Sequence, residues 1–264
     1  MIIVAKTLRD QRRALIGWAI GMAALVLLYA SFYPSIRSNA AALNKYVATA
    51  PEWIRNMIGN SGDISSSVGY IRSEIFSTMG PILLLILAIG AGARAIAGEE
   101  EGRTLDLLLA NPVRRRTVVL QKFWAMVAST SGVGMVLLIA LSLFGPAFGL
   151  HIAFVNLAAT VVSAIALAVC FGSIALAVGC WRGRKAVAVA ASTSLAVVLY
   201  LLNVLAPSVE GLSRFQVLSP FYHYIEYDPL RNGFSALHLS VLVAIAGVAL
   251  AVALVTFERR DLAS

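Results

Sequence analysis

Residues 75–97 read IFSTMGPILLLILAIGAGARAIA, and residues 98–116 follow directly with GEEEGRTLDLLLANPVRRR. The first stretch can cross a bilayer, because a transmembrane helix needs about 20 mostly apolar residues. The second stretch is charged and amphipathic, and another apolar run follows it. Core helices of soluble proteins are shorter and keep a polar face, so this pattern predicts a membrane protein.

Apolar runs of this kind recur along the chain. They predict six membrane-spanning helices, over residues 14–33, 75–97, 123–144, 154–180, 186–206 and 237–257. Helices are predicted because backbone polar groups in lipid must be satisfied within the segment, and the runs lack the alternation of barrel strands. We therefore expect a single all-α membrane domain over residues 1–264. Between the spans lie an outer loop at 34–74, a charged loop at 98–122 and an outer segment at 207–236.

The basic residues divide unevenly between the two sides of this topology. The chain has 21 Lys and Arg residues and a formal net charge of +8. About 15 of the 21 fall on the side that carries the N-terminus, the charged loop and the C-terminus. Because cytoplasmic segments are enriched in Lys and Arg, both termini are predicted to be cytoplasmic. The first run is longer than the apolar region of a signal peptide and is expected to be an uncleaved anchor.

Several function classes are disfavoured by what the spans lack. The positive charge follows the membrane sides and forms no single patch, so nucleic acid is not an expected partner. No Asp, Glu or Lys lies within the six spans, whereas such groups mark most ion-coupled carriers. Arg94 lies within a turn of the charged loop and is expected to reach back to the headgroups. No GxxxxGK(S/T) motif is present, so a partner would have to bind ATP.

The cysteines and histidines do not predict a metal site or a disulfide. Cys170 and Cys180 lie on one predicted helix, about 15 Å apart at 1.5 Å per residue, which is too far for a bridge. The histidines lie near the outer ends of different spans, at positions 151, 223 and 238. A metal site needs ligands that converge, so none is expected.

The charged loop has the features of a short amphipathic helix that begins at Glu99. Acidic residues suit a helix N-terminus, and Glu99 is placed to pair with Arg103 one turn later. Leucines three and four residues apart then form an apolar stripe. Pro112 ends the helix, and a basic stretch leads into the third span.

This helix has two interpretations. It could lie flat on anionic lipid, with leucines in the interface and arginines on phosphates. Three consecutive acids, Glu99 to Glu101, would be repelled there and suit a protein surface that offers Lys or Arg. The acids therefore favour a protein partner.

The charged loop resembles the loop between the second and third spans of ABC-2 type permeases, the membrane subunits of bacterial ABC exporters. That family shows an acidic cluster, a Gly-Thr-Leu, a leucine run, a Pro-Val, a basic patch and a lysine. The matching residues are Glu99, Glu100, Glu101, Gly102, Thr104, Leu105, Leu108, Pro112, Val113, Arg115 and Lys122. Arg103 separates Gly102 from Thr104, which are commonly adjacent in the family. The outer stretch 51–59, the ending 257–262 and the six-span count also fit, so the resemblance covers essentially the whole chain.

The resemblance implies a non-enzymatic permease subunit of an ATP-driven exporter in the bacterial cytoplasmic (inner) membrane. Two permeases, identical or related, would form the substrate path, and two copies of a separate ABC ATPase subunit would bind beneath them. The ATPase would bind ATP and Mg, and this chain would hold no cofactor and no catalytic residue. Residues 1–13 would form an interfacial connecting helix. The residues implied in coupling to the ATPase are Glu99, Glu100, Glu101, Gly102, Arg103, Thr104, Leu105, Leu108, Pro112 and Arg115.

The resemblance also places the second and fifth spans against the substrate path. The polar candidates on the fifth span are Ser192, Thr193, Tyr200 and Asn203. Such residues either contact substrate or form hydrogen bonds between helices. The uncharged spans and the aromatic stretch 220–232 suit an amphiphile such as a drug, lipid or peptide. On the fourth span, small residues at 168, 172, 175 and 179 predict close approach to a neighbouring helix.

Two other classes share part of this pattern. A non-transporting membrane scaffold or immunity protein would have the same spans without a dependence on ATP. An intramembrane hydrolase would need a nucleophile with its base, or paired acids with histidines, and the sequence lacks such a set. Whether two permease subunits would be identical or different is left open by the sequence.

Overall fold

The computed structural model describes residues 2–39, 66–105, 113–209 and 211–260, together with Lys45, Thr49 and Pro51. The ordered elements among these residues are all helical, as predicted. Six helices are long and apolar enough to cross a membrane, and they overlie the six predicted runs. These are α2 (Arg12–Ser38), a continuous helix over Ser67–Glu101, α9 (Arg115–Phe144), α10 (Phe154–Arg182), α11 (Lys185–Leu205) and α14 (Ala236–Arg259).

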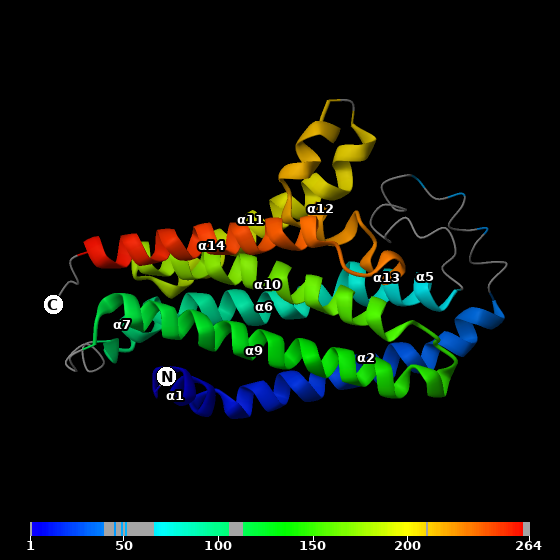
Figure 1. Cartoon of the computed structure of the whole chain (residues 1–264), viewed down its shortest axis with the longest axis horizontal. Helices are drawn as coiled ribbons and strands as arrows, with labels where there is room; N and C mark the ends of the chain where they lie inside the picture. The colour runs from blue at the N-terminus through cyan, green and yellow to red at the C-terminus, as the bar shows by residue number, and fades with distance from the viewer. Residues whose placement is uncertain are drawn as a thin grey trace.

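The long helices run side by side along the longest axis of the molecule (Figure 1). At one end lie α1 (Ile2–Asp10), α7 (Glu99–Glu101) and the C-terminal end of the sixth long helix. We call this the charged end, because it carries the three glutamates of α7. At the opposite end lie α5 (Ser67–Ile71), the 3₁₀ turn η3 (Pro146–Phe148) and α13 (Pro229–Asn232).

The helix over Ser67–Glu101 and α10 form the centre of the bundle, and the centres of both are mostly buried. By contrast, α2, α11 and α14 are buried over only a small part of their length. Their exposed side chains are large and apolar, for example Ile20, Val198 and Val248. Such a surface is unfavourable in water and favourable in the hydrocarbon of a bilayer, so the outer helices present a lipid-facing surface.

The two central helices touch backbone to backbone. An added Cβ on Gly92, in α6 (Gly80–Ala93), would lie 2.1 Å from the carbonyl oxygen of Gly172 in α10. A Cβ on Gly172 would lie 2.9 Å from the carbonyl oxygen of Ala88. Small residues permit such contacts between membrane helices. The predicted close approach of the fourth span is therefore confirmed, and its neighbour is the second span.

The second span contains two wide π-helical turns, η1 (Arg72–Met79) and η2 (Arg94–Gly98), on either side of α6. Pro81 follows η1 and has no N–H to donate to the turn before it, so the regular hydrogen-bond ladder is interrupted there. Wide turns of this kind shift the direction of the side chains around them and are frequent at functional sites. Each one contributes residues to one of the two cavities described below.

The predicted connecting helix at residues 1–13 is helical in its described part, over α1. It packs on α9, where the Oε1 atom of Gln121 accepts a hydrogen bond of 3.0 Å from the Ile3 N–H. A single turn residue, Gln11, separates it from α2. Its position at the membrane surface stays a prediction.

The outer segment folds into the short helices η4 (Ala206–Ser208), η5 (Ser213–Leu218), α12 (Pro220–Ile225) and α13. Figure 1 shows η4 and η5 projecting sideways from the bundle beyond the end of α11. The Tyr224 hydroxyl donates to the Phe76 carbonyl over 2.7 Å, and Arg72 pairs with Asp228 at 2.8 Å. These contacts connect the outer segment to the second span.

Two histidines far apart in the sequence meet where α12 packs on α14. The Nδ1 atoms of His223 and His238 are 3.1 Å apart, and the Nε2 atom of His223 is 3.0 Å from the Val217 carbonyl. A carbonyl only accepts, so His223 carries its proton on Nε2 and its bare Nδ1 accepts from the Nδ1–H of His238. Protonating His223 would therefore place two N–H groups face to face.

Lowering the pH is expected to destabilise this contact. Burial lowers the pKa of His223 below its usual range, and the neighbouring His238 adds to this effect. The unfolded chain then binds the proton more readily, so the contribution is intact above the ordinary histidine pKa of about 6.5 and is lost as the pH falls below it. Thermal unfolding at pH 7.5 and pH 5.5 should show a larger loss for the wild type than for His223→Gln. His151→Gln, at an exposed histidine, is the control; equal losses in all three proteins would contradict the assignment.

Candidate functional site

The charged end carries three consecutive glutamates, and each contacts a different helix or helix end. Glu99 pairs with Lys122 of α9, Glu100 pairs with Arg260 beyond α14, and Glu101 accepts a hydrogen bond at the start of α11. One turn of the second span is thereby connected to three other spans. We call these three interactions the glutamate lock.

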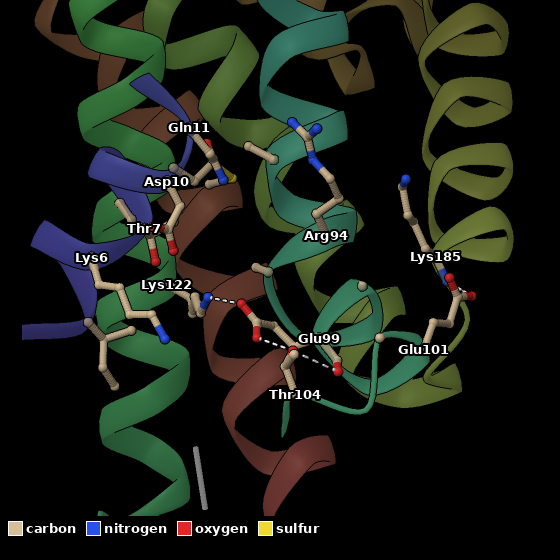
Figure 2. A pocket seen from close by; sticks show the side chains of 17 residues that line it. Lys6, Thr7, Asp10, Gln11, Arg94, Glu99, Glu101, Thr104, Lys122 and Lys185 are labelled. Atoms are coloured by element: carbon tan, nitrogen blue, oxygen red, sulfur yellow. Dashed lines mark hydrogen bonds and ion pairs between the residues drawn. The ribbon is translucent and has the colours of Figure 1, made fainter. Parts of the chain in front are cut away.

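Glu99 lies at the inner part of the lock (Figure 2). Its carboxylate accepts from Lys122 Nζ over 2.5 Å and from the Thr104 hydroxyl over 2.6 Å. The Lys122 side chain is only 6% exposed. Burying an ammonium group costs free energy unless the group is paired and hydrogen-bonded. Glu99 therefore offsets the cost of burying Lys122.

Glu100 holds the C-terminal end of α14. Its two oxygens accept from the Arg260 guanidinium over 2.5 and 3.1 Å, which is the bidentate geometry that gives strong pairs. The same guanidinium donates to the Cys180 carbonyl over 3.2 Å, and the Arg260 carbonyl accepts from Arg115 over 2.7 Å. Gly183 makes room for this guanidinium: it has a φ of +65°, and an added Cβ would lie 2.1 Å from Arg260 Nη2.

Glu101 lies at the N-terminus of α11. Its Oε1 atom accepts from the backbone N–H of Lys185, the first residue of that helix, over 2.9 Å. The first N–H groups of a helix have no partner within the helix, and the helix dipole favours a negative charge there. Glu101 therefore stabilises the start of the fifth span from the end of the second.

The prediction that a helix begins at Glu99 is wrong. The helix of the second span ends at Glu101, Gly102 follows as its cap, and Arg103 has a left-handed φ of 55°. The predicted pair of Glu99 with Arg103 is absent from the described residues, because Glu99 binds Lys122. The acids also do not stand free for a partner, since each has an internal partner. Leu108 and Pro112 lie outside the described residues.

The remaining predicted coupling residues form two groups. One group is an exposed turn, and the other packs against α14. Gly102, Arg103 and Thr104 are exposed at the tip of the charged end. Leu105 is 2% exposed and belongs to a cluster of apolar side chains that includes Phe257 of α14. Arg115 bonds to backbone carbonyls at the end of α14 and lies over the Phe257 ring. Among the described coupling residues, a partner can therefore reach the turn and the exposed Glu101 more readily than Glu99, Glu100 or Arg115.

A charged cavity of about 650 Å³ lies beside the lock, between α1, η2 and α9. Its apolar lining includes Ile3, Ala95 and Met126. Its charged lining residues are Lys6, Asp10, Arg94, Glu99, Glu101, Lys122 and Lys185. The sequence pattern indicates the acids and Lys122 but not the approach of α1, which brings Lys6 and Asp10 to the same cavity.

An apolar cavity of about 490 Å³ lies between α6, α11 and α12. Ile82, Ile86 and Ile89 of the second span form one side, and Val189 and Val197 of the fifth span form another. Phe221 and Tyr224 of the outer segment close one end. The cavity therefore lies between the two spans that the sequence predicted to border the substrate path.

Of the four predicted path residues, two line this cavity and two do not. Thr193 and Tyr200 line it. Ser192 is fully buried on another face of α11, and its hydroxyl has no partner among the described residues. Asn203 lies beyond the cavity, where its carbonyl accepts from Gln216 of η5 over 3.2 Å. Ser192 and Asn203 therefore do not line this cavity, because one is buried in the core and the other holds the outer segment, and their substrate contacts stay a prediction.

The described residues contain no group of three or more His, Cys, Asp or Glu side chains placed to hold a metal ion. Cys170 and Cys180 are buried and free. The candidate functional features among the described residues are therefore the two cavities and the glutamate lock.

Comparison with protein families matches residues 1–262 to the family described as ABC-2 family transporter protein. The chain belongs to this family. No match was found among curated proteins. The resemblance drawn from the charged loop is confirmed. The six apolar helices make this ABC-2 family protein a multi-pass membrane protein, and membership implies a typically non-catalytic transmembrane subunit with an ATPase partner.

Proposed function

We propose that this ABC-2 family protein is the permease subunit of an ATP-driven exporter, coupled to two separate ATPase subunits at the charged end. The observation that carries the proposal is the glutamate lock. A displacement of the exposed turn Gly102–Thr104 moves the three glutamates that precede it. Through their bonds the glutamates then move α9, α14 and α11. ATP and Mg are bound by the ATPase, and this chain binds neither.

In this scheme, ATP binding is coupled to movement of the spans because the ATPase contacts the permease differently in two conformational states. ATP binding brings the two ATPase subunits together, and the turn that each one holds moves with it. A conformational change follows only if the partner contacts one arrangement of the spans better than the other. The lock suits this role because short charged contacts at the end of the second span keep four helices moving together.

Two permease subunits form the substrate path. The apolar cavity is the part of the path that each subunit contributes. Support comes from its lining, which joins the second and fifth spans to the aromatic outer segment. The substrate is an amphiphile such as a drug, lipid or peptide. The charged end faces the cytoplasm of a bacterial cell, as the excess of Lys and Arg on that side predicts.

Co-purification from native membranes tests the partnership. Tagged wild-type chain in mild detergent is expected to retain an ATPase subunit with a Walker A motif. Arg103→Glu reverses the charge of the exposed turn and should reduce the retained ATPase roughly tenfold, the change expected when a contact worth about 1.4 kcal/mol is lost. Arg182→Glu is the matched control, an exposed arginine at the charged end outside the turn.

The rival assignments make different predictions in the same experiment. If intact wild-type protein retains no ATPase, the proposal fails. The assignment as a non-transporting membrane scaffold or immunity protein is then favoured. If Arg103→Glu and Arg182→Glu reduce the ATPase equally, the turn is not the docking surface.

A further inference from the structure

The apolar cavity and the charged cavity follow one another along the same pair of helices. Gly90 lines the apolar cavity and Arg94 lines the charged one, a turn apart on the second span. Val189 and Lys185 repeat this arrangement on α11. The two cavities therefore follow one another between the second and fifth spans, and we call the two together the groove. Its first part is apolar, and its part at the charged end carries charges of both signs.

Arg94 points along this groove. Its Nε donates to the Gly90 carbonyl over 3.1 Å, so the side chain extends back along its own helix, away from the charged end. The expectation that Arg94 reaches to the headgroups at the charged end is therefore wrong. Its terminal NH₂ groups have no ion pair among the described residues, and the residue is exposed.

Lys185 stands across the groove from Arg94. Figure 2 shows both side chains extending in the same direction from their helices. Glu101 is the nearest acid drawn beside Lys185, and it accepts from the backbone N–H of that residue. No ion pair of the Lys185 ammonium is present among the residues that the structure describes. The Arg94 guanidinium and the Lys185 ammonium thus have no ion pair among the described residues, although Asp10 and Glu101 also line the charged cavity.

We propose that this groove binds an anionic amphiphile with a single apolar tail, with its acidic head on Arg94 and Lys185. The tail lies along Ile82, Ile86 and Val197, towards Tyr200 and Phe221. This assignment rests on the proposed function, because it names the class of substrate that the permease takes.

The length of the groove fits one lipid tail. From Thr78 to Gly90 the second span advances twelve residues, about 18 Å at a rise of 1.5 Å per residue. Half of a bilayer core that is about 30 Å thick is about 15 Å, which is the depth that one tail covers. A tail of ordinary length therefore fills the apolar part while its head reaches Arg94.

The charged residues that line the cavity determine which charge the head group of the amphiphile must carry. An acidic group accepts charge-assisted hydrogen bonds from a guanidinium and an ammonium, which are stronger than neutral ones. The lining of the charged cavity holds four cations, Lys6, Arg94, Lys122 and Lys185, and three acids, Asp10, Glu99 and Glu101. An acidic head balances the excess positive charge, whereas a cationic head adds to it. Lys122 does not contribute, since Glu99 already neutralises it.

Photolabelling of the purified full-length chain in a neutral detergent tests the assignment. The probes are a fatty acid with a diazirine in its tail and the methyl ester of the same acid, both at pH 8. The acid is expected to label peptides covering residues 82–90 and 189–200 roughly tenfold more than the ester, as a charge-assisted contact to the head predicts. Arg94→Gln and Lys185→Gln should each lower labelling by the acid and leave labelling by the ester unchanged. Arg182→Gln is the matched control and should behave as the wild type.

Three results would overturn the proposal. Equal labelling by acid and ester would show that the head is not recognised. Selectivity that survives Arg94→Gln combined with Lys185→Gln would place recognition elsewhere. Competition by inorganic phosphate at millimolar concentration would show a site for free anions instead of amphiphiles. The experiment contains no ATPase, so its failure is distinct from a failure of the co-purification test.

Discussion

Glu100→Arg is expected to release the C-terminal end of α14 from the charged end and to expose Cys180 to thiol reagents. The variant removes a bidentate pair whose side chains are only 24% and 21% exposed, and it places a second guanidinium against Arg260. Breaking a buried pair costs about 3–5 kcal/mol, and partial exposure places this one at about 3 kcal/mol. Arg260 also donates to the Cys180 carbonyl, so its departure opens the surface over that residue.

The rate of maleimide labelling, read by mass spectrometry at each cysteine, measures this release. Cys180 should react at least roughly tenfold faster in the variant, the change that about 1.4 kcal/mol of easier opening produces. Cys170 is buried further along α10 and serves as an internal reference. The exchange Glu100→Arg with Arg260→Glu restores opposite charges and should slow the reaction again. An unchanged Cys180 rate in Glu100→Arg would show that the pair does not hold α14.

Gly92→Val is expected to separate the two central helices. A Cβ at this position would lie 2.1 Å from the Gly172 carbonyl oxygen, which is backbone and cannot rotate away. Overpacking typically costs 1–3 kcal/mol, and a clash with backbone belongs at the upper end, about 3 kcal/mol. For a chain of this size that corresponds to a fall in Tm of roughly 10 °C.

Thermal unfolding in detergent, followed by fluorescence or by loss of the monodisperse peak, provides the measurement. Gly132→Ala and Gly247→Ala are the controls, because an added Cβ at either position meets nothing within 4 Å. Alanine favours a helix over glycine by about 1 kcal/mol, so these variants should keep or raise the Tm. A Tm of Gly92→Val equal to theirs would contradict the packing described for α6 and α10.

The spans could be predicted from sequence because the signal is local. A run such as residues 154–180 is uncharged and mostly apolar, and this composition is enough to predict a membrane helix. The same holds for the close approach of the fourth span, since Gly172 has no side chain to keep a neighbour away. The sequence left open which neighbour comes close.

The charged loop shows where local patterns fail. The spacing of Glu99 and Arg103 fits a helical pair, yet Glu99 binds Lys122, which lies 23 positions along the chain. Glu100 binds Arg260, 160 positions away. Ion pairs depend on distance in space, so contacts at such separations leave no periodic trace in one sequence. The sequence pattern therefore indicates the three acids but not the residues with which they pair.

The sequence by itself therefore determined the membrane class, the number of spans and, through its charged loop, the family, because each depends on residues adjacent in the chain. Only the tertiary structure decided that the glutamates lock four helices together, that Ser192 and Asn203 lie off the apolar cavity, and that Arg94 turns along the groove towards Gly90. The physical reason is that a membrane helix is apolar on all its faces, and both lipid and neighbouring helices are apolar too. Hydrophobicity therefore does not distinguish one face of the helix from another. Which face meets which partner is then settled by packing and pairing between distant segments, not by hydrophobicity along the chain.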